Sequence, residues 1–172
     1  MFADCPQDYQ DWFSDPKEAE VYTDSQHSGS IGPARTLLNI ADLSQAKTML
    51  DVGGGSGAWS ITLANANPQL NSAVLDFPNV CTVGRHKVAE AGLESQVSFI
   101  EGNCLTTEWP EGQDIILMSY LSSSVSGDDL PELYQRAYDC LNPGGQLIVH
   151  DFMCEDDRKG PPLAALWVSR TP

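Results

Sequence analysis

Short apolar runs alternate with longer helical patterns along the chain after residue 47. Each run has the length of a β-strand. The runs that we expect to form strands cover residues 48–52, 72–77, 97–102, 114–121 and 145–152. Helices are predicted between them, near residues 57–66, 79–91 and 129–141. Alternating strands and helices are typical of βαβ units, so the pattern predicts an α/β fold whose parallel sheet carries helices on both faces.

The N-terminal part of the chain lacks this alternation and predicts a helical segment. Asp15 followed by Pro16 is typical of a helix start, because Asp caps free backbone amides and proline fits the first turn. The later sequence QHSGS is expected to interrupt this helix, and a second short helix is predicted over 33–41. We therefore divide the chain into a helical segment or lid, residues 1–45, and a second domain, residues 46–172.

The sequence after the fifth predicted strand implies that more structure follows. A polar loop, CEDDRKGP, leads into PLAALWV, which is typical of the beginning of a helix. The predicted sheet would have five strands, and its fifth strand would be an edge whose apolar face lacks cover. We therefore expect the second domain to be C-terminally incomplete.

The composition argues against several classes of partner. Among 172 residues, 24 are Asp or Glu and 9 are Lys or Arg, which gives a net charge of −15. This charge repels phosphate and anionic lipid, so we expect neither a nucleic acid nor a membrane as partner. No apolar run approaches the roughly 20 residues of a transmembrane helix and no signal-peptide pattern is present, so a cytoplasmic protein is expected. The 5 cysteines are widely spaced without a CxxC pair, which favours reduced thiols over disulfides or a zinc site.

The sequence LDVGGGSG, residues 50–57, leaves the first predicted strand and enters the next helix. Glycine allows positive φ and a close approach of the backbone to a ligand, and the following helix start supplies N–H donors. Asp76 ends the second predicted strand, 19 residues after Gly57, where a carboxylate can accept both ribose hydroxyls of an adenosine. Loop and acid together predict a cofactor that contains a nucleoside.

The glycine loop also fits a dinucleotide fingerprint, Gly53-x-Gly55-x-x-Ala58, so an NAD(P)-dependent oxidoreductase is an alternative. Asp51 argues against it, because an acid two residues before the first glycine attracts an ammonium group and repels a pyrophosphate. The third predicted strand ends in residues 102–104, Gly-Asn-Cys, where it is positioned to meet an adenine ring. These features favour a cofactor with a charged amino-acid end.

With the block LNPGG before the fifth predicted strand, the sequence resembles the class I S-adenosylmethionine-dependent methyltransferases. Within them it is similar to the O-methyltransferase family that includes the acetylserotonin, hydroxyneurosporene and plant small-molecule enzymes. The resemblance covers about residues 20–168 and is carried by LDVGGGSG, LDFPNV, EGN, DIILMSYL and LNPGGQLIVHDF. It implies a Rossmann-like, doubly wound parallel sheet of the class I methyltransferase type, here missing the last two strands. It also implies methyl transfer from S-adenosyl-L-methionine to a small-molecule acceptor, which we expect to be a hydroxyl group.

The resemblance also implies the residues of the cofactor site. The family usually has an Asp followed by an apolar residue against the adenine, and here those positions hold Asn103 and Cys104. The site residues expected are Asp51, Gly53, Gly55 and Gly57 at the methionine end, Asp76 at the ribose, Asn103 and Cys104 at the adenine, and Ser119 beside the fourth strand.

The histidine that serves the resembled family as a general base is absent from this chain. Its place in an HDW segment is taken by Ser123, which cannot act as a base alone. His150 and Asp151 end the fifth predicted strand, which faces the ligand crevice of an open α/β sheet, and His27 lies on the predicted lid. These four residues are our catalytic candidates, and an acceptor carbon, nitrogen or acidic oxygen would need no base.

Two further expectations concern the whole protein. The resembled enzymes carry an N-terminal dimerisation domain and further C-terminal elements that this chain lacks, so a homodimer is expected of a full-length form. A non-catalytic, methyltransferase-like binding protein is the third interpretation, beside the methyltransferase and the oxidoreductase, because Ser123 replaces the usual base.

Overall fold

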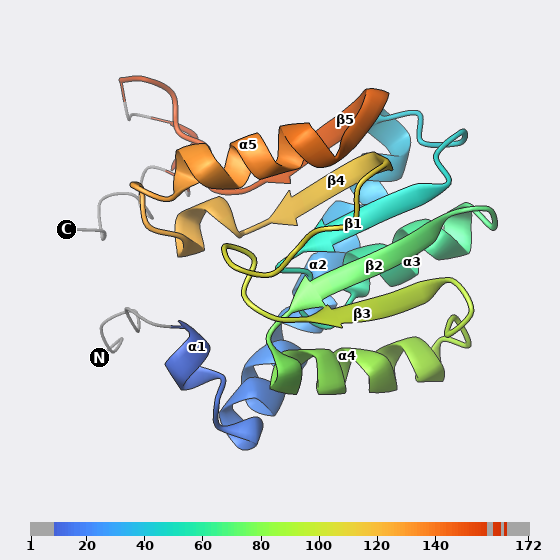
Figure 1. Ribbon diagram of the computed structural model, residues 1–172, viewed down its shortest axis with the longest axis vertical. Helices are drawn as coiled ribbons and strands as arrows, with labels where there is room; N and C mark the ends of the chain where they lie inside the picture. Colours follow the sequence, from blue (N-terminus) through green and yellow to red (C-terminus); the bar gives the residue numbers. More distant parts are fainter. Residues whose placement is uncertain (1–8, 158–159, 163, 165–172) are drawn as a thin grey trace.

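The computed structural model describes residues 9–157, 160–162 and 164. Its centre is a parallel sheet of five strands in the order β3-β2-β1-β4-β5 (Figure 1). The strands are β1 (Thr48–Val52), β2 (Asn71–Asp76), β3 (Val97–Glu101), β4 (Gln113–Ser119) and β5 (Leu141–His150). The strand order reverses between β1 and β4, and open sheets of this kind bind ligands beyond the carboxyl ends of the strands at such a point. The predicted α/β fold is confirmed.

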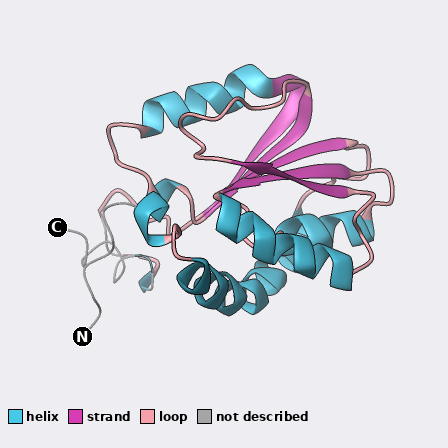
Figure 2. Cartoon of the chain, turned by 60° about the horizontal axis from the view of Figure 1, so that its bottom comes forward, coloured by secondary structure: helices cyan, strands magenta, loops and turns pink. Residues whose placement is uncertain are grey.

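Helices cover both faces of the sheet. α2 (Pro16–Ile40), α3 (Ala58–Ala66) and α4 (Pro78–Glu90) lie on one face, and α5 (Leu130–Cys140) lies on the other (Figure 2). A short N-terminal helix, α1 (Tyr9–Trp12), precedes them, and a 3-10 turn, Ser122–Ser124, follows β4. The doubly wound arrangement expected from the sequence is therefore present.

The sheet has an apolar core on each of its two faces, because successive side chains of a strand point to opposite faces. In β4, Ile115 and Leu117 pack with α2 and α3, whereas Ile116 and Met118 pack with α5. All four side chains are almost fully buried. A strand buried on both faces has no polar face, which explains why β4 is one continuous apolar run in the sequence.

The predicted break at QHSGS is wrong. α2 begins after Asp15 as expected, with the Asp15 carboxylate accepting from the backbone N–H of Lys17 at 2.8 Å, but it continues through this sequence to Ile40. The separate helix predicted over 33–41 is therefore the end of α2, and Pro33 lies inside it.

Tertiary packing explains why α2 is continuous. Ala34 and Leu37 are buried in the core that α2 shares with α3, and Ala19 is buried against Phe13 and Val80 near α4. Glycine and proline inside a helix cost about 1 and 3 kcal/mol, so local propensity predicts a break. Burial of both ends of the helix outweighs that cost.

The boundary between α5 and β5 also differs from the prediction. The sequence predicts a helix that ends at residue 141 and a strand that begins at residue 145, but α5 ends at Cys140 and β5 begins at Leu141. The register steps from Gln113 opposite Leu141 to Ile115 opposite Gln146, so the intervening residues form a bulge in β5. Such irregularity is tolerated because β5 is an edge strand of the described sheet.

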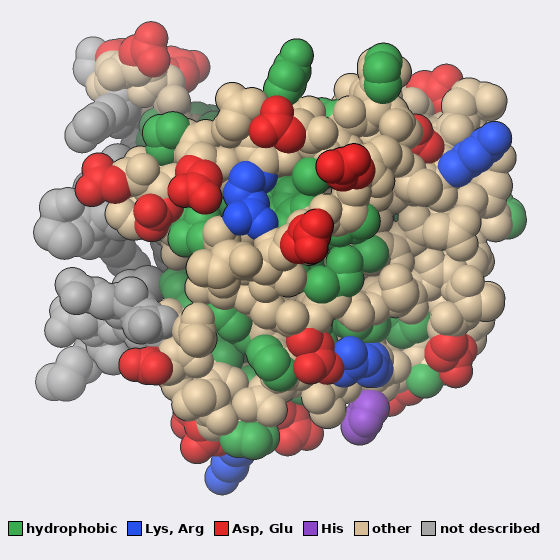
Figure 3. Space-filling view, in the orientation of Figure 1, with side chains coloured by type: hydrophobic (Ala, Val, Ile, Leu, Met, Phe, Trp, Pro, Cys, Tyr) green, Lys and Arg blue, Asp and Glu red, His purple; other side chains and the backbone are tan. Residues whose placement is uncertain are grey.

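Several other expectations concern the chain as a whole. None of the helices within the described ranges is long and apolar enough to cross a lipid bilayer. The described cysteines, Cys81, Cys104, Cys140 and Cys154, are free thiols. Acidic side chains are spread over the face seen in Figure 3, with few basic ones between them. The helix predicted in PLAALWV lies mostly outside the described residues.

Candidate functional site

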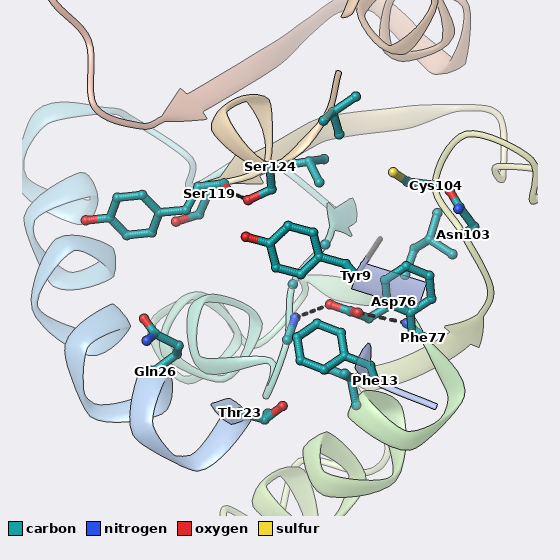
Figure 4. A pocket seen from close by; sticks show the side chains of 18 of the residues that line it. Tyr9, Phe13, Thr23, Gln26, Asp76, Phe77, Asn103, Cys104, Ser119 and Ser124 are labelled. Atoms are coloured by element: carbon teal, nitrogen blue, oxygen red, sulfur yellow. Dashed lines mark hydrogen bonds between the residues drawn. The ribbon is translucent and has the colours of Figure 1, made fainter. Parts of the chain in front are cut away.

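A cavity of about 320 Å³ lies at the carboxyl ends of β1, β2 and β4 (Figure 4). This volume is within the range of small-molecule sites. The turns after the strands line it together with residues of the N-terminal segment. The lining residues are Tyr9, Gln10, Phe13, Tyr22, Thr23, Gln26, Ser30, Gly53–Ser56, Trp59, Leu75–Phe77, Val80, Gly102–Leu105, Ser119–Leu121, Ser124–Ser126 and Asp129.

The glycine turn after β1 forms the floor of the cavity. Gly53, Gly55 and Gly57 have φ values of +66°, +59° and +72°, which L side chains rarely adopt. A Cβ at Gly54 would lie 2.5 Å from the carboxyl carbon of Asp51, so this position has no room for a side chain. Gly53 and Gly55 line the cavity, whereas Gly57 caps the start of α3 and is not among the described lining residues.

Asp76, at the end of β2, lies at the centre of the cavity wall. Its carboxylate accepts from the backbone N–H of Gly55 at 2.8 Å and of Phe77 at 2.7 Å, as the dashed lines of Figure 4 show. Burial raises the pKa of Asp76 to about 6, although both hydrogen bonds favour the charged form. A carboxylate held by the glycine turn is thus aimed at any ligand in the cavity.

Asp51 lies beneath the same turn and is fully buried. Its Oδ2 accepts from the hydroxyl of Ser60 at 2.7 Å, and its Oδ1 has no hydrogen-bond partner among the described residues. Burial raises the pKa of Asp51 to about 7, with a further contribution from the charge of Asp76. The described lining of the cavity does not include Asp51, which is separated from it by Gly54.

Two more buried polar atoms lack a partner within the described part of the chain. They are Oγ1 of Thr23 on α2 and Nε1 of Trp59 on α3. An unpaired buried donor costs about 1–3 kcal/mol, so such atoms are uncommon unless a ligand or water pairs with them. Both residues line the cavity, so a ligand in the cavity is a candidate partner for these two donors.

The turn after β3 forms the opposite side of the cavity from Gln26 and Ser119 (Figure 4). The side-chain Oδ1 of Asn103 accepts from the backbone N–H of Leu105 at 2.9 Å. Burial, together with the charge of Asp76, raises the pKa of the Cys104 thiol to about 11. At pH 7 the Cys104 side chain is therefore a neutral, weakly polar thiol in the cavity lining.

Ser119, at the end of β4, contacts a histidine on β5. The Ser119 Oγ lies 3.0 Å from Nδ1 of His150, whose ring packs against Trp59 and Tyr120. Burial lowers the pKa of His150, while the charge of Asp151 opposes this effect. Tyr120 has φ of +56°, a strained value for a non-glycine residue, and such strain is common at functional sites.

His150 and the three other catalytic candidates all lie outside the described lining of the cavity. The carboxylate of Asp151 accepts from the backbone N–H of Ser123 at 3.0 Å and from that of Phe152 at 2.8 Å. His27 contacts the glycine turn instead of the cavity, with its Nδ1 2.8 Å from Oγ of Ser56. Of the sequence-derived set, the cavity wall combines Gly53, Gly55, Asp76, Asn103, Cys104 and Ser119.

Sequence reasoning missed the aromatic residues of the cavity. Tyr9, Phe13 and Tyr22 reach it from the N-terminal segment, and Phe77 and Tyr120 follow β2 and β4. Phe13 packs against Tyr22 and Phe77, with ring centroids 5.2 and 6.0 Å apart. The one available signal was the density of aromatic residues in the segment interpreted as a lid.

Comparison with known proteins identifies the family. A family model described as the O-methyltransferase domain matches residues 7–169. L-tyrosine C(3)-methyltransferase of Streptomyces lavendulae is 31% identical over 88% of this chain and 41% of its own length. Acetylserotonin O-methyltransferase of Homo sapiens is 31% identical over 77% of this chain and 38% of its own length.

Solved structures agree with these sequence matches. The S-adenosylmethionine-dependent methyltransferase SibL, in its apo form, superposes with a TM-score of 0.75 at 34% identity, covering 91% of this chain and 46% of that one. The chain thus spans less than half the length of these relatives. The sequence resemblance is confirmed, because the family model matches nearly every residue: this chain belongs to the O-methyltransferase domain family.

Proposed function

We propose that this chain binds S-adenosylmethionine and forms part of an enzyme that methylates a small molecule. The observation that carries the proposal is one cavity that joins the glycine turn, the carboxylate of Asp76 and two unpaired buried donors, Thr23 and Trp59. In this proposal residues 46–172 are the cofactor-binding domain and residues 1–45 are its lid. The homodimer and the cytoplasmic location expected from the sequence remain predictions.

The residues present fit a nucleoside with an amino-acid end. Asp76 would accept from the ribose hydroxyls, and the turn holding Asn103 and Cys104 would receive the adenine. Gly53 and Gly55 would hold the methionine end, with Gly57 shaping the turn, and the buried charge of Asp51 would face its ammonium group from beneath the turn. When bound, S-adenosylmethionine supplies the methyl group from its sulfonium sulfur.

Ser119 and His150 would take the proton from the hydroxyl group of the molecule that is methylated. The acceptor proton would pass to Oγ of Ser119 while the serine proton moves to Nδ1 of His150, across the 3.0 Å contact. Because burial lowers the pKa of His150, its imidazole is neutral and able to take a proton at pH 7. Asp151 and Ser123 bind each other outside the described lining, so they have no direct contact with the acceptor in this proposal.

The cavity also supports a class of acceptor. Aromatic rings from Tyr9, Phe13, Tyr22, Trp59 and Tyr120 line it, which favours a flat aromatic molecule. Two of the matching proteins are named for methylation of L-tyrosine and of 3-hydroxy-5-methyl-1-naphthoate, which are both aromatic. We therefore propose an aromatic acceptor methylated on a hydroxyl oxygen.

Calorimetric titration tests cofactor binding. S-adenosylhomocysteine and NADH are titrated separately into the chain, and we expect saturable binding of S-adenosylhomocysteine alone. Binding of NADH without S-adenosylhomocysteine would instead favour the oxidoreductase.

Transfer of a labelled methyl group from S-adenosylmethionine to a library of phenols tests the reaction. Label in an ether product supports O-methylation, and label on a ring carbon would shift the proposal to C-methylation. Cofactor binding with no transfer to any acceptor would favour the non-catalytic binding protein.

A further inference from the structure

The amino-acid end of the cofactor carries a carboxylate, and the cavity has no basic side chain to receive it. Among the described lining residues none is Lys, Arg or His, and the two charged ones, Asp76 and Asp129, are acidic. A carboxylate in such a cavity must be held by neutral N–H and O–H donors and by the backbone at the start of α3. Residues that orient those donors therefore control binding of this part of the ligand.

Ser56 is the hydroxyl nearest the start of α3 in the cavity lining. It stands between Gly55 and Gly57, the N-cap of α3, and it is 5% exposed. Because a serine hydroxyl has one proton, it can donate to a ligand only if its contact with His27 does not use that proton. The direction of the contact between Ser56 and His27 thus decides whether Ser56 is a donor or an acceptor in the cavity.

His27 is placed to set this direction from outside the cavity. Its Nδ1 lies 2.8 Å from Oγ of Ser56, and it stands four residues after Thr23, so both side chains share one face of α2. Thr23 carries one of the two unpaired buried donors of the lining, and the other is the indole N–H of Trp59. On one face of α2, Thr23 therefore lines the cavity and His27 contacts the glycine turn.

Resting on the proposed function, we propose that His27 is a positioning residue for the amino-acid end of the cofactor. The Nδ1–H of His27 donates to Oγ of Ser56, and the Ser56 hydroxyl proton is thereby free to donate to the ligand carboxylate. His27 itself does not touch the ligand. A protonated His27 always has the Nδ1–H. A neutral His27 has it in only one of its two tautomers.

The surroundings of His27 make the arrangement sensitive to pH. Burial and the charge of Lys87 on α4 lower the pKa of His27, whereas Asp24 on α2 and Glu90 on α4 raise it. Lys87 is itself paired with Asp24 at 3.0 Å. The free chain therefore holds a mainly neutral His27 at pH 7, and a bound carboxylate favours its protonation. Binding of the carboxylate should strengthen as the pH falls from 8 to 6.

Two ligands separate this effect from binding of the nucleoside. S-adenosylhomocysteine carries the amino-acid end, and 5′-methylthioadenosine has the same nucleoside and thioether without it. Calorimetry at pH 8 and pH 6 gives the ratio of their affinities, in which changes at the ribose and adenine cancel. Asp51, which faces the ammonium group and has a pKa of about 7, loses its charge over the same pH range and lowers this ratio in wild type and variants alike. The contribution of His27 is therefore the difference between wild type and His27→Asn, and we expect the wild-type ratio at pH 6, relative to pH 8, to exceed that of His27→Asn severalfold.

Variants of His27 provide the test. His27→Ala should lower the affinity for S-adenosylhomocysteine about tenfold and leave that for 5′-methylthioadenosine within twofold, because only the former has the carboxylate. His27→Asn keeps an N–H donor, so we expect affinity within about threefold of wild type at pH 8 and a ratio that changes with pH only through Asp51. His86→Ala, on the exposed side of α4, is the matched histidine control.

Each outcome decides the inference. Unchanged affinity of His27→Ala for S-adenosylhomocysteine would overturn it, as would an equal loss for both ligands, which would mean a general packing defect. A pH-dependent ratio in His27→Asn like that of wild type would overturn it too. If the wild-type chain bound neither nucleoside, the proposed function itself would fail and the inference with it.

Discussion

Replacing Asp51 with asparagine removes a carboxylate that the fold buries at an energetic cost. The carboxyl group is fully buried beneath Gly54, and only one of its oxygens has a partner among the described residues, the hydroxyl of Ser60. An asparagine at this position keeps the shape and an oxygen that accepts from Ser60. The change therefore tests the charge with little effect on packing.

The magnitude follows from the pKa of Asp51. Burial raises this pKa from 3.8 to about 7, and one pKa unit corresponds to about 1.36 kcal/mol, so the ionised form costs about 4 kcal/mol in the folded state. The folded chain binds the proton more tightly than the unfolded chain, so the free energy of unfolding falls as the pH rises from about 4 to about 7. Between pH 6 and pH 8 the wild-type chain should lose about 1–1.5 kcal/mol through this group.

Urea unfolding followed by tryptophan fluorescence at pH 6 and pH 8 measures the effect. We expect Asp51→Asn to be more stable than wild type at pH 8 by about 1–3 kcal/mol, since part of the 4 kcal/mol is lost to an unpaired amide N–H. Its stability should also change less between the two pH values. Glu94→Gln, at an exposed carboxylate, is the control for the loss of one negative charge.

Two results would refute the reasoning about Asp51. One is a variant less stable than wild type at pH 8, and the other is a wild-type stability that does not fall between pH 6 and pH 8. If the variant is stabilised, we also expect weaker binding of S-adenosylhomocysteine, because the charge opposite the ligand ammonium is gone. A group that destabilises the fold and strengthens ligand binding is typical of functional sites.

Three further changes test other parts of the structure. Asp76→Ala should weaken S-adenosylhomocysteine binding by about 1–3 kcal/mol in calorimetry, and unchanged affinity would contradict the ribose assignment. Gly84→Ala would place a Cβ 2.5 Å from the ring of Phe99 and should cost about 1–3 kcal/mol in urea unfolding, whereas Gly127→Ala, in open space, should change stability by less than about 0.5 kcal/mol. His150→Gln should slow methyl transfer about 100-fold at pH 7 while leaving cofactor affinity unchanged; equal rates would exclude the histidine as proton acceptor.

The sheet was predictable because its strands have a local signature. The run Thr48–Val52 was predicted with its observed bounds, and the other strands were found within a few residues. Such runs are visible because strands buried on both faces contain few polar residues. The bulge at residues 142–145 was not predicted, because it depends on the register with β4.

The candidate site was only partly predictable. The glycine turn and Asp76 were found because their spacing between strand and helix is a local pattern. The burial of Asp51 and the contact between Ser119 and His150 depend on residues that are distant in the sequence. No motif spacing in the sequence predicts either feature.

By itself, the sequence determined the alternation of strands and helices, the turn after β1 and the acid at the end of β2, since each rests on neighbouring residues and their backbone preferences. Only the tertiary structure decided that α2 is one continuous helix, that its face places His27 against Ser56, and that aromatic residues of the N-terminal segment line the cavity. These features depend on packing between segments far apart in the chain, where burial of apolar surface outweighs the local preferences of glycine and proline.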